Sequence, residues 1–122
     1  MADEKTMPVD VSKLDTLINN INGKPIVIDD EELSIRMAAM ISLETTSDKD
    51  TPFMEKYRRS NIARKIERAT DQLELTKKEV KSLKLCAGKA FGSRIMTDIW
   101  DLFDPNNDIE IGEDEKPEKK KE

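Results

Sequence analysis

The stretch SIRMAAMISL, residues 34–43, decides how this chain folds. From Ile35 to Leu43 the residues are apolar except for Arg36 and Ser42. A helix that is apolar on all sides is buried on all sides, so this one belongs at the centre of the domain. Ser34 precedes it as the N-cap, because a serine hydroxyl accepts a hydrogen bond from a free N–H of the first turn. The stretch therefore predicts a central helix that the other elements surround.

Two longer helices follow the central one. Thr51 is the predicted N-cap of the first, with Pro52 in its first turn, and the helix runs to about residue 70. Its predicted inner face consists of Phe53, Tyr57, Ile62, Ala63, Ile66 and Ala69. Residues 76–79, Thr-Lys-Lys-Glu, form a full capping box, which starts a second helix at Lys77.

Two more helices and a hairpin complete the predicted elements. The last helix carries one apolar stripe at i, i+4, i+7 and i+8, namely Ile95, Ile99, Leu102 and Phe103. Between residues 10 and 23, a stripe at i, i+3, i+4 and i+7 predicts an N-terminal helix with Leu14, Leu17, Ile18 and Ile21 inward. The β-branched run at residues 26–28 predicts one strand, which turns through residues 29–32 to Leu33 as a hairpin.

We therefore expect a mainly α fold, a compact bundle of four to five short helices with one small β-hairpin near residues 25–34 and disordered termini. The chain of 122 residues has room for one domain. We place this helical domain at residues 10–104, with a disordered N-terminus at 1–9 and a disordered acidic tail at 105–122. The charge run of the tail cannot bury enough apolar surface to order itself.

Composition excludes several classes of function. The chain has no histidine, which is the commonest general base and metal ligand. Its single cysteine, Cys86, rules out an internal disulfide and lies in a helical pattern typical of a small buried hydrophobe. We therefore expect neither an enzyme nor a bound cofactor. No apolar run approaches the roughly 20 residues that span a bilayer, and the N-terminus lacks the order of a secretory signal, so we expect a cytoplasmic protein without membrane contact.

The net charge of −5 hides a block-wise distribution. Residues 55–94 carry 12 basic and 5 acidic side chains, whereas the segments on both sides are net acidic. A basic block can neutralise phosphates, which makes a nucleic-acid surface one hypothesis. Its residues would be Arg58, Arg59, Arg64, Lys65, Lys77, Lys78 and Lys81. Two features oppose it: the link 71–75 lacks the glycine usual in a helix-turn-helix, and Tyr57 and Phe91 are expected inside, away from bases. The same cations could pair with the chain's own acidic ends.

Trp100 is the better pointer to a binding surface. It lies off the apolar stripe of the last helix, and Met96 precedes it on the same helix. A second apolar side on a terminal helix predicts a contact with a partner, and tryptophan is common among binding hot spots. With Arg58 and Arg59, these side chains form the predicted partner-binding set. The partner is a host or virion protein, with a homo-oligomer as the alternative.

The C-terminal segment matches part of a twelve-residue calcium loop. The ligand positions counted from its start hold Asp104, Asn106, Asp108, Glu110 and Glu115. Ile109 stands where the sharp turn needs glycine, and no helix is predicted to follow. Calcium-dependent binding through residues 104–115 is therefore a third hypothesis.

Three groups of residues form a further pattern: GKPI (23–26) with LSI (33–35), KYRR (56–59) with IARKI (62–66), and LTKKEV (75–80) with GKAF (88–91) and IWDL (99–102). In order and spacing they resemble small helical proteins encoded by tailed phages and prophages, over about residues 23–103. The resemblance implies a phage-encoded protein and carries over no catalytic residue. The leading hypothesis is a non-enzymatic interaction protein that acts as an assembly helper or as an inhibitor of a host system.

Overall fold

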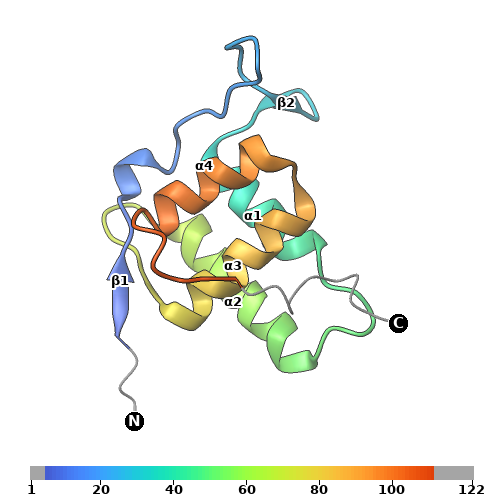
Figure 1. Ribbon diagram of the computed structural model, residues 1–122, viewed down its shortest axis with the longest axis vertical. Helices are drawn as coiled ribbons and strands as arrows, with labels where there is room; N and C mark the ends of the chain where they lie inside the picture. Colours follow the sequence, from blue (N-terminus) through green and yellow to red (C-terminus); the bar gives the residue numbers. More distant parts are fainter. Residues whose placement is uncertain (1–4, 112–122) are drawn as a thin grey trace.

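Helix α1, Ile35–Thr45, lies at the centre of the computed structural model, which describes residues 5–111 (Figure 1). It packs against the three other helices, α2 (Phe53–Arg68), α3 (Lys77–Ala90) and α4 (Ser93–Phe103). The Ser34 hydroxyl accepts a hydrogen bond from the Met37 N–H at 3.1 Å and so caps the helix. The predicted mainly α fold with a central helix is confirmed.

The starts of α2 and α3 are capped differently. At α3 the Thr76 hydroxyl accepts from the Glu79 N–H at 3.2 Å, and the Glu79 carboxylate accepts from the Thr76 N–H at 2.9 Å. This is the predicted capping box. Thr51 instead accepts a hydrogen bond from the Asp48 N–H at 3.0 Å, which turns its hydroxyl toward the preceding loop. The N-cap of α2 is therefore Pro52, without a side-chain hydrogen bond.

The predicted helix between residues 10 and 23 is wrong. This segment contains one 3-10 turn, η1 (Val11–Lys13), and then runs alongside the chain that leads into α1. The Ile18 N–H donates to the Leu33 carbonyl at 2.8 Å, and the Ile26 N–H donates to the Ile18 carbonyl at 2.9 Å. Partners outside the segment thus replace the helical hydrogen bonds. The predicted stripe is consequently split between two buried residues, Leu14 and Ile18, and two exposed residues, Leu17 and Ile21.

The predicted hairpin is confirmed, but its turn occupies only residues 29–30, and residues 31–32 belong to the returning strand. Strand β2 (Val27–Ile28) pairs antiparallel with β3 (Glu31–Glu32). Asp29 and Asp30 form the turn with φ of 53° and 70°. A two-residue hairpin turn of type I′ needs a positive φ at both positions, which aspartate tolerates better than most residues. The hairpin projects from one end of the molecule (Figure 1).

Parts of both predicted disordered ends pack against the domain. Strand β1 (Thr6–Pro8) pairs antiparallel with β4 (Glu74–Thr76), and the Val9 N–H donates to the Leu73 carbonyl at 2.9 Å. Beyond α4, the side chain of Ile109 is buried. The domain therefore includes residues 5–9 and 105–111, which our boundaries left out, because one apolar residue in each segment reaches the core. The rest of the two predicted ends, residues 1–4 and 112–122, lies outside the described residues.

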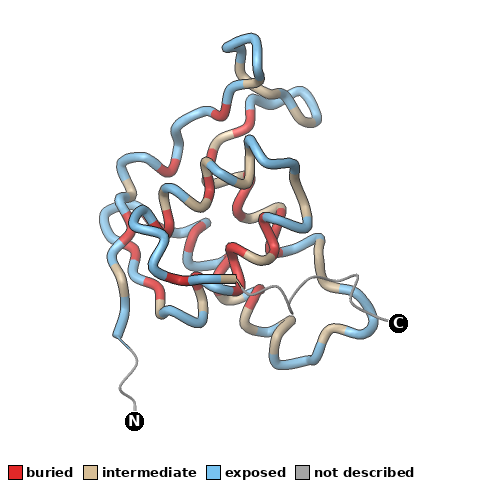
Figure 2. Tube along the Cα trace, in the orientation of Figure 1, coloured by how far each residue is buried: buried red, intermediate tan, exposed pale blue. Residues whose placement is uncertain are grey.

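The first two turns of α2 extend past the core. Buried residues gather on the facing sides of the helices (Figure 2). In α2 they begin only at Arg59 and continue with Ile62, Ala63 and Ile66. Phe53 and Tyr57, predicted on the inner face, are exposed, because the buried side of α2 begins only at Arg59. The exposed start of this helix is the first feature of the candidate site.

Candidate functional site

Three large apolar side chains lie exposed at the start of α2. Phe53 is 84% exposed, Met54 70% and Tyr57 61%. Lys56 lies over the Phe53 ring, with its Nζ 5.7 Å from the ring centre. Single exposed apolar residues are ordinary, but a contiguous group marks a contact site in many soluble proteins. We call Phe53, Met54 and Tyr57 the α2 patch.

Two shallow hollows adjoin this patch where α2 meets α3. One has a volume of about 290 Å³ and is lined by Met54, Tyr57, Arg58, Asn61, Thr76, Lys78 and Glu79. The other has a volume of about 350 Å³ and is lined by Pro52, Glu55, Arg58, Arg59, Lys78, Lys81, Ser82 and Leu85. Arg58 and Lys78 line both hollows, so the two adjoin along the helix pair. We call this surface the α2–α3 seam.

The seam is positively charged. Its exposed or half-exposed cations are Arg58, Lys78 and Lys81, its carboxylates are Glu55 and Glu79, and the buried Arg59 lines it from beneath. Both carboxylates already accept hydrogen bonds from within the protein. Glu55 binds Arg59 at 2.8 Å and also Arg58, and Glu79 binds Lys65 at 2.7 Å. Burial raises the pKa of Glu55, but hydrogen bonds from Arg59 and Ser82 outweigh it and lower the pKa below its usual value.

The predicted nucleic-acid residues divide into internal and surface groups. Arg59 is only 4% exposed, and its guanidinium also donates to Ser47 at 3.1 Å, which holds the loop after α1 against α2. Lys65 pairs with Glu79 but stays exposed, and Arg58 pairs with Glu55 but stays half exposed. The others are also exposed at the surface: Arg64, Lys77, Lys78 and Lys81. Arg59 therefore does not contribute to an open binding face.

Trp100, which is half buried, contacts α3. Its indole Nε1 donates to the Lys84 carbonyl at 3.0 Å, and its ring lies 4.3 Å from the Lys84 Nζ. Met96 is half buried beside Gly88 of α3, where an added Cβ would meet the Met96 sulfur at 3.5 Å. These contacts explain why Trp100 lies off the apolar stripe: it covers a charged group. Trp100 and Met96 therefore contribute to the fold, and their role in binding a partner stays a prediction.

That charged group, Lys84, was not singled out by the sequence. It is fully buried, and its ammonium donates to Asp104 Oδ2 at 2.8 Å, to Asn107 Oδ1 at 2.9 Å and to the Ile109 carbonyl. A signal was present, because Lys84 follows Val80 by four residues and so shares the apolar face of α3. A lysine on a buried face needs charge and hydrogen-bond partners. The loop after α4 provides them.

This arrangement bears on the proposed calcium loop. Burial raises the pKa of Asp104, but hydrogen bonds from Lys84 and from the N–H groups of Ile109 and Asp108 outweigh it and lower the pKa below its usual value. The Lys84 ammonium thus takes the place that a metal ion would need at the first ligand. Within residues 5–111, no group of three His, Cys, Asp or Glu side chains could hold a metal ion. Glu115 lies outside the described residues.

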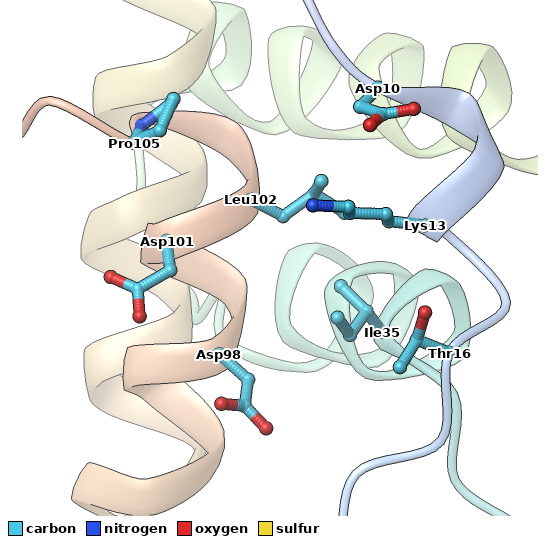
Figure 3. A pocket seen from close by; sticks show the side chains of 8 residues that line it. All are labelled: Asp10, Lys13, Thr16, Ile35, Asp98, Asp101, Leu102 and Pro105. Carbon is cyan, nitrogen blue, oxygen red and sulfur yellow. The ribbon is translucent and has the colours of Figure 1, made fainter.

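A third hollow, of about 410 Å³, lies between η1, α1 and α4. It is lined by Asp10, Lys13, Thr16, Ile35, Asp98, Asp101, Leu102 and Pro105. Lys13 extends across it toward Leu102, while Asp98 and Asp101 turn to different sides (Figure 3). Burial and the neighbouring Asp101 carboxylate raise the pKa of Asp98, and Arg94 opposes them. The two carboxylates therefore do not point toward one another.

Comparison of the chain with protein-family models, with curated proteins and with solved structures found no match. Across residues 5–111, no helix is long and apolar enough to cross a membrane.

Proposed function

We propose that this protein is a non-enzymatic binding protein whose α2 patch and α2–α3 seam take up a segment of a partner protein. One observation carries the proposal, namely that Phe53, Met54 and Tyr57 lie exposed together beside a cation-lined hollow. The role suggested by the resemblance to phage proteins, an assembly helper or an inhibitor of a host system, fits such a surface.

The chemistry of the seam indicates the kind of partner. Apolar side chains of the partner would cover the α2 patch. Each large apolar side chain that becomes fully buried favours the complex by about 1.5–3 kcal/mol, before the entropy cost of association is subtracted. Carboxylates of the partner would face the seam, because complementary charge speeds encounter and excludes partners of like charge. Apolar area and positive charge together favour an acidic segment that also carries apolar residues.

A matched pair of variants tests this proposal. Phe53→Ser with Tyr57→Ser removes the apolar area, and Phe53→Leu with Tyr57→Phe keeps it. We expect immobilised wild type and the conservative variant to retain the same protein from a lysate of the producing cells, and the serine variant to lose it. Titration calorimetry with the purified partner should then show binding weakened at least tenfold. Equal binding by both variants would refute the proposal.

Single-stranded nucleic acid is the second candidate, and one observation favours it. Tyr57 is exposed beside Arg58 and Lys78, so the expectation that it is unable to stack on a base is wrong. Stacking on aromatic side chains within a basic groove is how many proteins bind single strands. A gel shift with a single strand of about 16 nucleotides tests it. At about 50 mM salt, the absence of a complex at tens of micromolar protein would dismiss this candidate.

A further inference from the structure

The hairpin end of the molecule carries a surface opposite in charge to the seam. Asp29, Asp30, Glu31 and Glu32 are all exposed there. Exposed apolar residues accompany them, since Val27 is 58% exposed and Ile21 is 82% exposed. Lys24 is the one cation between residues 19 and 32. We call residues 19–32 the hairpin end.

The hairpin end therefore has the chemistry that the seam favours in a partner, an acidic segment with apolar residues. The hairpin and the start of α2 lie at opposite ends of the long axis of the molecule (Figure 1). Because of this separation, they cannot touch within one chain, and the two surfaces can meet only between copies.

We propose that the hairpin end of one copy binds the α2–α3 seam of another. The four carboxylates of the hairpin would face Arg58, Lys78 and Lys81, and Val27 or Ile21 would cover part of the α2 patch. Contacts between like ends are disfavoured, since they would bring two acidic hairpins or two basic seams together. Pairing of unlike ends permits an antiparallel pair or an open chain of copies.

This inference rests on the proposed function, because it assigns a second copy as occupant of the same seam. An interface built around one hairpin is small, so association should be weak and dependent on concentration. It should also weaken with salt, because exposed charges are screened beyond about 10 Å at 0.1 M salt.

Charge reversal on each surface, and on both together, tests the pairing. The hairpin variant is Glu31→Lys with Glu32→Lys, and the seam variant is Lys78→Glu with Lys81→Glu. The combined variant carries all four changes and has the net charge of the wild type. Glu44→Lys with Glu67→Lys is the matched control, because both residues are exposed and lie outside the two surfaces. Circular dichroism establishes that every variant is folded.

Sedimentation at about 10 µM to 1 mM protein in low salt gives the readout. We expect the wild type and the control to rise above the monomer mass of 13.9 kDa, and each single-surface variant to stay at that mass or to associate at least tenfold more weakly. The combined variant should associate again, though more weakly than the wild type, because the net charge changes from −3 to +1 at the hairpin end and from +2 to −2 at the seam. A wild type that remains monomeric throughout, single-surface variants that associate as the wild type does, or a combined variant without recovery would each overturn the inference. The proposed function is judged separately, by whether the serine variant at Phe53 and Tyr57 loses a foreign partner.

Discussion

Removing either partner of the Lys84–Asp104 pair should destabilise the protein strongly. Both side chains are almost fully buried, at 0% and 3% exposed, and lie 2.8 Å apart. Breaking a buried pair by removing one partner costs about 3–5 kcal/mol, because the other charge remains without its counter-ion. Lys84→Met leaves Asp104 two backbone N–H donors, so we expect the lower end of that range. Asp104→Asn leaves a buried ammonium, so we expect the upper end.

Urea unfolding followed by the fluorescence of Trp100, the single tryptophan, measures this effect. Because a domain of this size loses about 1–3 kcal/mol of stability per molar urea, the midpoint should fall by about 2 M. The control is Lys65→Met, which breaks the Lys65–Glu79 pair. Because the Lys65 side chain is 46% exposed, this substitution should lower the free energy of unfolding by about 1 kcal/mol or less. The variant with both Lys84→Met and Asp104→Asn should lose less than the sum of the single losses, because it leaves no unpaired charge. Single losses no larger than that of the control would refute the reasoning.

Three further predictions follow from buried or capping groups. The folded pKa of Asp104 lies below its unfolded value, so its contribution to stability is complete above about pH 4 and is lost as the pH falls through the folded pKa. Urea midpoints measured between pH 7 and pH 2 should therefore fall less steeply for Asp104→Asn than for the wild type. The guanidinium of Arg36 donates to the Ile66 carbonyl at 2.6 Å and the Ala69 carbonyl at 2.9 Å, so Arg36→Met should lower the free energy of unfolding by about 2–4 kcal/mol in urea titrations. Cys86 is fully buried and burial raises its thiol pKa, so a thiol reagent should label it far faster in urea than in the native protein; equal rates would contradict the burial.

Elements with local signals could be predicted from the sequence. The capping box at Thr76, the N-cap at Ser34 and the turn at Asp29 and Asp30 each depend on residues within four positions of one another. The helix expected between residues 10 and 23 had an equally good apolar stripe. Its backbone N–H groups find carbonyl partners as far away as Leu33, and no local pattern reports such partners.

The candidate site could be predicted only in part, because burial of a charged side chain depends on distant partners. The sequence indicated the basic block but not which cations the fold uses internally. Arg59 and Lys84 both lie in that block and are buried. Lys84 shares a helix face with Val80 and Ala87, and this pattern indicated that the lysine is buried. Nothing local marked Phe53 and Tyr57 as exposed, since their exposure depends on which sides of α2 the neighbouring helices cover.

The internal use of these cations changes what the basic block means for binding. Arg59 is held by Glu55 and Ser47, and Lys84 by Asp104, and both are buried. Electrostatic attraction of phosphates depends on the cations that reach solvent, so the block attracts nucleic acid less than its composition suggests. The cations that line the seam lie beside Met54 and Tyr57 instead of forming a uniform basic face. A surface that combines apolar area with a few fixed cations distinguishes partners by their apolar side chains as well as by charge, which is a property of protein interfaces.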